Sequence, residues 1–237
     1  MSTSMTLLEL RTAVRQRADI VNSTQFFPDA ELNSYINQSY FELYDLLVQK
    51  FGDNYFVANP FSITTDGVNF LYSLPTDMYK LMGVDLALSN TADSYVTIKP
   101  FLMSDRNRYS VPNFQSFYGV TNLRYRLNGN KLWLTPLPAA NQNLRLWYVP
   151  TMTTLALDTD TVNGVSGWTE YIIIDACIKV KEKEESESSA FINQKMAMMK
   201  RIENAAENRD QGSPKTVADT QYNDFQFQTN WQGSGTF

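Results

Sequence analysis

The hydrophobic period of the chain changes twice, and this change restricts the folds that it can form. Near both ends, apolar residues recur every three or four positions, which is typical of amphipathic helices. Through the middle they alternate with polar residues, which is typical of half-buried strands. The sequence therefore predicts an α+β protein, in which an antiparallel β module is inserted into a helical core.

Two helices are expected before the strands. Thr6 and Glu9 form a T-x-x-E capping box, so the first helix spans about residues 6–18. Pro28 begins the second helix, and Gly52 ends it after an uninterrupted apolar stripe. That stripe consists of Leu32, Ile36, Tyr40, Leu43 and Leu47. The arginines on the other face of the first helix are expected to be solvated or salt-bridged: Arg11, Arg15 and Arg17.

Two further helices are expected after the strands. The first begins at Thr169 and is so apolar through residue 178 that it must be largely buried, with Cys177 as a small hydrophobic residue inside it. A tight turn through "ESESS" then leads into an antiparallel final helix. Its expected apolar stripe is Ile192, Met196, Met199, Ile202 and Ala206.

Two short turn motifs predict hairpins in the β module. Asp66-Gly67 is expected to form a two-residue turn that places Ile63 opposite Phe70. Asn128-Gly129 is expected to form a second such turn, in "RYRLNGNKLWLTP". In that register Arg124 lies directly opposite Trp133.

The strand after this second hairpin, "NLRLWYV", adds Arg145 and Trp147 on its polar face. Three interpretations of this arginine and tryptophan face remain open. Arginine and tryptophan are enriched at protein interfaces, which favours a partner interface formed by Arg124, Trp133, Arg145 and Trp147. The face could also be plain sheet surface with a local cation–π pair, or a platform on which a nucleic acid or polysaccharide stacks.

The charge balance argues against tight DNA binding. The 237 residues include 20 Lys and Arg against 25 Asp and Glu, a net charge of −5. DNA-binding domains are normally basic, because neutralising phosphates supplies most of their affinity. Passage of DNA nearby is compatible with this charge.

The sequence offers little catalytic chemistry. It contains no histidine, which excludes histidine-based triads and HExxH zinc sites. It contains one cysteine and no glycine-rich nucleotide motif, so we expect no cofactor and no metal. Asp158 and Asp160 are interpreted as turn residues, although a hydrolase that uses paired carboxylates stays a third hypothesis.

Membrane association is not expected. No stretch approaches the ~18 apolar residues of a membrane span, and the N-terminal residues lack the apolar region of a secretory signal. We therefore expect the protein to assemble in a cytoplasm.

The domain boundaries follow from these patterns. Residues 1–53 and 166–211 are expected to form the helical core, and residues 54–165 the inserted β domain. Residues 212–237 form an extended C-terminal tail that combines turn residues and amides with aromatics, whereas linkers are poor in aromatics. We expect this tail to bind a partner through Tyr222, Phe225, Phe227, Trp231 and Phe237.

Four stretches together resemble the head-to-tail adaptor (connector) proteins of tailed bacteriophages. They are "LLELRTAVRQRADIVNSTQFFPDAELNSYINQSYFELYDLLVQKFGDNYF", "YSLPTDMYKLMGVDLAL", "LWLTPLPAANQNLRLWYVP" and "GWTEYIIIDACIKVKEKEES" with "RIENAAENRDQGSPKTVAD". They occur in the same order over roughly residues 6–220. Pro28 stands where a serine cap is expected before "DAEL", and the residues after about 220 match no pattern of the family.

The resemblance implies a structural virion protein rather than an enzyme. It implies a dodecameric ring of identical subunits beneath the portal protein, with genome DNA passing through the bore. It also implies a C-terminal extension that docks onto the portal, and a β module that meets tail nozzle or tail fibre proteins. An acidic channel would let DNA pass without sticking, because like charge prevents phosphate contacts.

Overall fold

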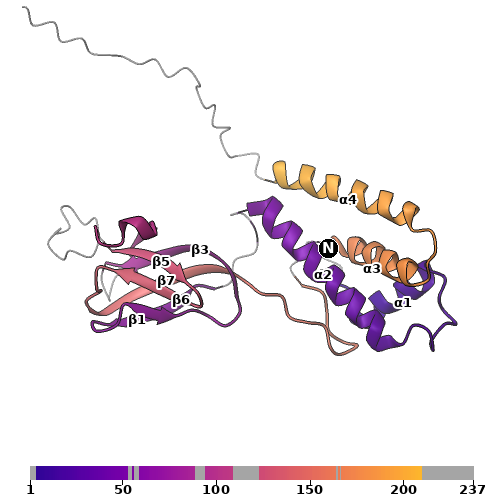
Figure 1. Cartoon of the computed structure of the whole chain (residues 1–237), viewed down its shortest axis with the longest axis horizontal. Coiled ribbons are helices and arrows are strands. Elements are labelled where there is room, and N and C mark those ends of the chain that lie inside the picture. Colours follow the sequence, from indigo (N-terminus) through magenta and orange to yellow (C-terminus); the bar gives the residue numbers. More distant parts are fainter. Residues whose placement is uncertain are drawn as a thin grey trace, which may run out of the picture.

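The computed structural model describes residues 4–52, 55, 59–88, 94–108, 123–163, 165 and 167–209. The fold is α+β, as predicted: the helices occupy one end of the long axis and the strands form a sheet at the other (Figure 1). Two separate clusters of buried apolar side chains correspond to these two ends.

The helices within these residues are α1 (Leu7–Arg17), α2 (Asp29–Phe51), α3 (Thr169–Lys183) and α4 (Ser189–Glu207). The strands are β1 (Phe61–Asp66), β2 (Leu71–Ser73), β3 (Met78–Ala87), β4 (Tyr95–Pro100), β5 (Arg124–Asn128), β6 (Lys131–Thr135) and β7 (Ala140–Pro150). A short 3₁₀ helix, η2 (Met103–Asp105), follows β4.

The first three helices form largely as the sequence predicts. The side chain of Thr6 accepts from the backbone N–H of Glu9, and the Glu9 carboxylate accepts from the N–H of Thr6, which completes the capping box of α1. The predicted stripe of α2 is buried along its whole length. In α3 every residue from Tyr171 to Ile178 is buried, which confirms that this helix lies inside the core.

The arginines of α1 are salt-bridged, and they connect α1 to three other parts of the chain. Arg11 is buried and places its Nη2 2.9 Å from Oδ1 of Asp158, in the segment that returns from the β module. Arg15 pairs with Asp29 at the start of α2, at 2.8 Å. Arg17 pairs with Glu170 in the first turn of α3.

A buried carboxylate joins α4 to the rest of the helical core. Asp175 of α3 is 3% exposed and pairs with Lys179, and with Lys195 of α4 at 2.7 Å. Lys179 also donates to the hydroxyl of Ser39 on α2 at 3.1 Å. Burial alone would raise the pKa of Asp175, but the hydrogen bonds from Lys179 and Lys195 outweigh it and hold that pKa below its ordinary value.

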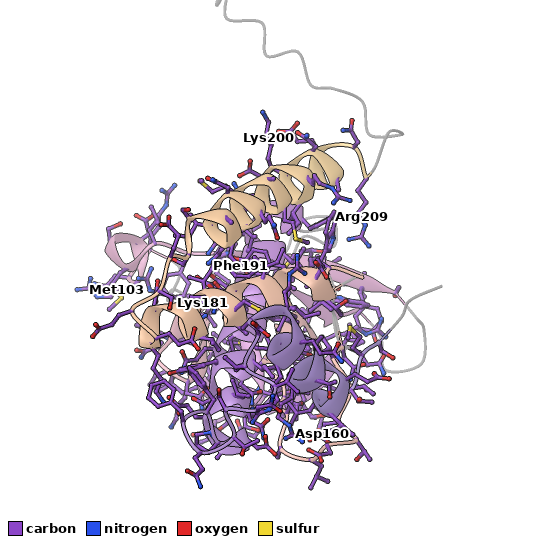
Figure 2. The ribbon with its side chains drawn as sticks, turned by 90° about the vertical axis from the view of Figure 1, so that its right-hand side faces the viewer. Met103, Asp160, Lys181, Phe191, Lys200 and Arg209 are labelled. Carbon is purple, nitrogen blue, oxygen red and sulfur yellow. The ribbon has the colours of Figure 1, made fainter. Side chains whose placement is uncertain are left out.

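The predicted stripe of α4 is partly wrong. Ile202 is buried and Met199 packs on the core, but Ile192 and Met196 are exposed. Lys195 faces Asp175, and in this rotation the side of α4 that faces the core carries Phe191 and Lys195, which are partly buried, and Met198 and Ile202, which are buried. Figure 2 looks onto this end of the molecule and shows Phe191 between α4 and α3.

The seven strands form one sheet in the order β1-β7-β3-β4-β5-β6-β2. Neighbours are antiparallel except for β4 and β5, which run parallel. The first and last strands of this order, β1 and β2, are joined by the short turn over residues 67–70, so the sheet curls until its two edges approach. Alternate residues point inward and form the apolar core of the module.

The predicted Asp66-Gly67 hairpin is wrong, because β1 does not pair with β2. Ile63 lies opposite Leu144 of β7 instead of Phe70. The Asp66 carboxylate accepts from the backbone N–H groups of residues 68 and 69, at 3.0 and 2.8 Å, and so closes a wider turn than two residues allow. Gly67 has a φ of +75° and a Cβ there would lie 3.0 Å from Ala140, so this turn needs glycine.

The second hairpin exists, but its predicted register is shifted by two residues. Gly129 and Asn130 form the turn, with positive φ at Gly129 alone, which is the type II′ pattern. Trp133 therefore lies opposite Arg126, and Arg124 lies opposite Thr135. A shift of two residues preserves the faces, so the arginines and Trp133 still share one side of the hairpin.

Replacing Asp175 by asparagine is expected to lower the free energy of unfolding by about 3 kcal/mol, because two partly buried ammonium groups lose the buried carboxylate between them. Urea denaturation at pH 7 measures this loss. The pKa of Asp175 is lowered in the folded state, so its stabilisation is complete above its ordinary value of 3.8 and is lost as the pH falls below it. The difference between variant and wild type should therefore shrink below about pH 4.

Glu42→Gln is the matched control. Glu42 contacts the same two lysines, at 3.2 Å and 3.8 Å, but its side chain is half exposed. A solvated pair contributes less than about 1 kcal/mol. Equal losses in both variants would contradict the role given to Asp175.

Candidate functional site

Trp133 lies in a partly exposed aromatic cluster on the outer face of β5 and β6. Its ring meets the ring of Phe101 edge-on at 5.4 Å between centroids, and that of Phe70 at 6.2 Å. Arg126, its cross-strand neighbour, donates to the carbonyl of Phe101 at 3.3 Å. Arg124 lies further along the same face, beside Lys99 of β4.

Arg145 and Trp147 form a second group, on the outer face of β7. The indole N–H of Trp147 donates to the Asp85 carboxylate of β3 at 2.6 Å. The guanidinium of Arg145 lies over the ring of Tyr95, 3.7 Å from its centroid. The same Asp85 carboxylate accepts from Thr97 of β4 at 2.7 Å, so this group is a connected polar layer across three strands.

The structure thus divides the four predicted residues into two groups. Strands β3, β4 and β5 lie between the strand of Trp147 and that of Trp133. The two indoles are not neighbouring platforms, and this arrangement does not favour the nucleic-acid or polysaccharide interpretation, which needs successive stacking positions.

Sequence reasoning missed several members of these groups. Phe70 was not predicted because the expected hairpin placed it opposite Ile63. Phe101 was not predicted because it follows the end of β4, where the alternation of apolar and polar residues has stopped. Lys99 could have been found, because it alternates with the buried Ile98 in "YVTIKP". The predicted tail residues lie outside the described residues: Tyr222, Phe225, Phe227, Trp231 and Phe237.

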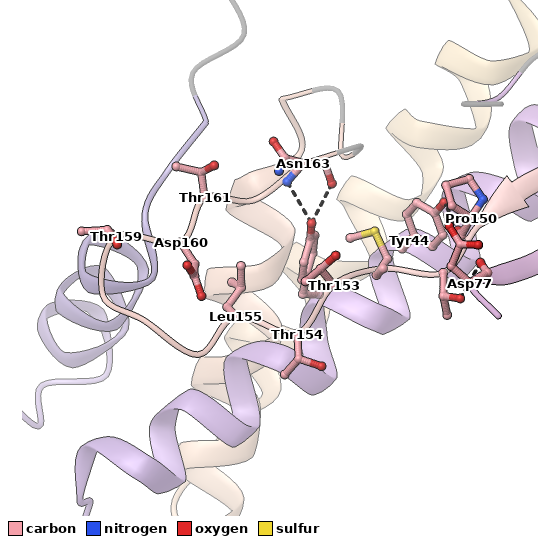
Figure 3. A pocket seen from close by; sticks show the side chains of 13 residues that line it. Tyr44, Asp77, Pro150, Thr153, Thr154, Leu155, Thr159, Asp160, Thr161 and Asn163 are labelled. Atoms are coloured by element: carbon pink, nitrogen blue, oxygen red, sulfur yellow. Dashed lines mark hydrogen bonds between the residues drawn. The ribbon is translucent and has the colours of Figure 1, made fainter. Parts of the chain in front are cut away.

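A groove of about 860 Å³ lies between α2 and the segment that returns from β7 to the helical core, residues 151–163 (Figure 3). Five threonines of this return segment line the groove: Thr151, Thr153, Thr154, Thr159 and Thr161. Thr161 also pairs with Thr6, and the N–H of Val162 donates to the carbonyl of Met5 at 3.0 Å, so the segment is fixed against the chain before α1.

Tyrosines of α2 bind the return segment at two points. The hydroxyl of Tyr40 donates to the carbonyl of Asn163 at 2.7 Å and accepts from its N–H at 2.8 Å (Figure 3). The hydroxyl of Tyr44 donates to the carbonyl of Pro150 at 2.7 Å. Burial raises the pKa of Tyr44 to about 12, so this hydroxyl is a structural donor rather than an activated nucleophile.

The β module is fastened to α2 beside this groove. The hydroxyl of Tyr79, on β3, donates to the Asp45 carboxylate of α2. The N–H and hydroxyl of Thr151, just after β7, donate to the carbonyl of Asp77, just before β3, at 2.5 and 2.7 Å. The neighbouring ends of β3 and β7 are therefore held together and held against one helix.

The predicted turn at Asp158 and Asp160 is confirmed for one of its two carboxylates. The Asp160 carboxylate accepts from the backbone N–H groups of residues 156 and 157, at 2.7 and 2.8 Å, whereas Asp158 pairs with Arg11.

Cys177 is fully buried, which raises the pKa of its thiol to about 11. Over the described residues, no cluster of three or more acidic, cysteine or histidine side chains could hold a metal ion. None of the helices described is long and apolar enough to cross a membrane.

One family model matches both the helical core and the inserted β module. A sequence model described as SU10 adaptor protein matches residues 5–218, which includes every described residue except Ser4. The protein is therefore a structural adaptor of bacteriophages and a component of the virion. The chain belongs to the SU10 adaptor family. No curated protein matches it.

Tyr40→Phe is expected to lower the free energy of unfolding by about 2 kcal/mol, because the N–H and C=O of Asn163 both lose a buried partner. Thermal and urea denaturation measure the loss. Tyr35→Phe is the control, since the Tyr35 hydroxyl bonds only the partly exposed Glu31 carboxylate, and should cost less than 1 kcal/mol. If the two variants lose the same stability, Tyr40 does not anchor the return segment.

Proposed function

We propose that this protein is the head-to-tail adaptor of a tailed phage, a ring that joins the portal to the tail. The observation that carries the proposal is the family match over residues 5–218. The ring is expected to be a dodecamer assembled in the host cytoplasm, with genome DNA passing through its channel without sequence-specific binding. The protein acts by burying surface between subunits rather than by catalysis.

We assign separate tasks to three parts of the chain. Residues 1–53 and 166–211 form the helical adaptor core, which packs side by side with its neighbours. Residues 54–165 form the β domain, which meets tail nozzle or tail fibre proteins through the groups around Trp133 and Trp147. Residues 212–237 form the tail that grips the portal. The separate apolar clusters of the two ends support the division into core and module, but Leu155, Val162 and Val165 belong to the cluster of the helical core, so the return segment packs with that core.

The charge of the chain supports a channel through which DNA slides. Asp and Glu exceed Lys and Arg by five, and the helical core carries exposed carboxylates. Phosphates held by many basic side chains would retain the genome, whereas an acidic wall releases it.

Deleting residues 213–237 is expected to weaken binding to purified portal by about 100-fold or more, because a few buried aromatics carry most of the free energy of such interfaces. The described helices and strands all end before residue 208, so the unfolding midpoint should not change. Co-sedimentation with portal and thermal denaturation measure the two effects.

A full-length variant tests whether the aromatic side chains of the tail, rather than its length, are needed for portal binding. In this variant alanine replaces the five tail aromatics: Tyr222, Phe225, Phe227, Trp231 and Phe237. It should bind portal as poorly as the deletion does. Unchanged affinity of the deleted chain would overturn the portal grip. Electron microscopy of adaptor with portal that shows no closed, coaxial ring would overturn the function itself.

A further inference from the structure

Helix α4 carries apolar side chains on two of its sides. On one side Phe191, Met198 and Ile202 pack on the core. On the other, Ile192 and Met196 lie one helical turn apart and are 40% and 54% exposed. A helix that is apolar on more than one side is typically covered on more than one side. The second side therefore needs a partner that the described residues of this chain do not provide.

Lys200 extends this second side by one further turn, and we call Ile192, Met196 and Lys200 the outer side of α4. Lys200 is exposed, and among the described residues no carboxylate forms an ion pair with it. Figure 2 shows it at the top of the helical end, where it points away from the core. The outer side of α4 thus fits a surface that combines apolar side chains with negative charge.

A surface of that kind lies where the return segment meets α1. Leu8 of α1 is 48% exposed, and Leu157 of the return segment is 65% exposed. The N–H of Leu8 donates to the carbonyl of Asp158 at 3.2 Å, so Leu8 lies beside the turn that carries Leu157. We call these two leucines the leucine patch.

Two carboxylates border the leucine patch. The Glu9 carboxylate, next to Leu8, accepts from the N–H of Thr6 at 2.8 Å, and the Asp160 carboxylate accepts from the N–H of Leu157 at 2.8 Å. In the part of the chain that the structure describes, neither carboxylate forms an ion pair with a basic side chain. The border of the leucine patch is therefore negatively charged.

The outer side of α4 and the leucine patch lie on opposite sides of the same end of the molecule. Figures 1 and 2 both show α4 at the top of the helical end, and Figure 2 shows Asp160 at its bottom. The two surfaces therefore cannot meet within one molecule. They can meet between two copies that stand side by side with their long axes in the same direction.

We propose that the outer side of α4 in one subunit docks onto the leucine patch of a second copy of this chain. The inference rests on the proposed ring and names one contact between neighbouring subunits. Lys200 meets the negative border formed by Glu9 and Asp160, and this pairing of charges sets the register of the contact. The contact joins two different surfaces, and such contacts between identical subunits close into rings or extend into filaments.

One charged substitution on each surface tests the contact. Met196→Glu places a carboxylate against Glu9 and Asp160, and Leu157→Lys places an ammonium group against Lys200. Each should raise the concentration of full-length chain that half-saturates purified portal by about 10-fold or more, because each bound copy loses the support of its neighbour. The chain with both changes brings opposite charges together, so it should bind better than either single variant by about 5-fold or more. Mass photometry measures the saturation.

Leu88→Glu is the matched control. Leu88 is 51% exposed and lies directly after β3 in the β module, so the same gain of charge should change the half-saturating concentration by less than about 2-fold. Thermal denaturation should give all variants the unfolding midpoint of wild type, since every changed side chain is on the surface.

Each outcome decides one question. Unchanged half-saturation in Leu157→Lys or in Met196→Glu overturns the inference, and so does a double variant that binds no better than the single variants. Loss in Met196→Glu alone means that the outer sides of two α4 helices pair by a two-fold contact. A wild-type chain that binds portal only as independent copies overturns the proposed ring itself.

Discussion

The burial of α3 is the constraint on which the rest of the structure depends. Its residues from Tyr171 to Ile178 are all buried, so other elements must cover this stretch of the helix on every side. The other three helices provide that cover. The order in which they do so is fixed by charge, since Arg17 reaches Glu170 from α1, and Lys195 reaches Asp175 from α4. An apolar helix with a single buried acid thus specifies both the packing and the rotation of its neighbours.

Local signals in the sequence predicted the helices well, because capping and the 3.6-residue period act within a few turns. The capping box at Thr6 and the stripe of α2 are of this kind. The α4 stripe failed where a distant partner intervened: the apolar residues alone favour Ile192 and Met196, but Lys195 must turn inward to reach Asp175. A periodicity argument contains no information about a buried charge on another helix.

In the β module, the alternation of apolar and polar residues predicts which face a side chain lies on, but it does not predict which strands pair. Alternation correctly placed Arg124, Trp133, Arg145 and Trp147 on the polar face. It could not predict that β1 pairs with β7, because the bonds from the Asp66 carboxylate to residues 68 and 69 direct the chain across to the other edge of the sheet. The distribution of the four residues into two groups follows from strand order, which depends on contacts far apart in sequence.

The attachment of the β module to α2 has a mechanical consequence. Tyr79 at the start of β3 and Pro150 at the end of β7 are both bound by side chains of α2, from Asp45 and Tyr44. A force applied to the module is therefore shared between two neighbouring strands and transmitted to one helix, α2. The direction in which the module points is then set by the orientation of α2, so small rotations of this helix would swing the far edge of the sheet through a much larger arc.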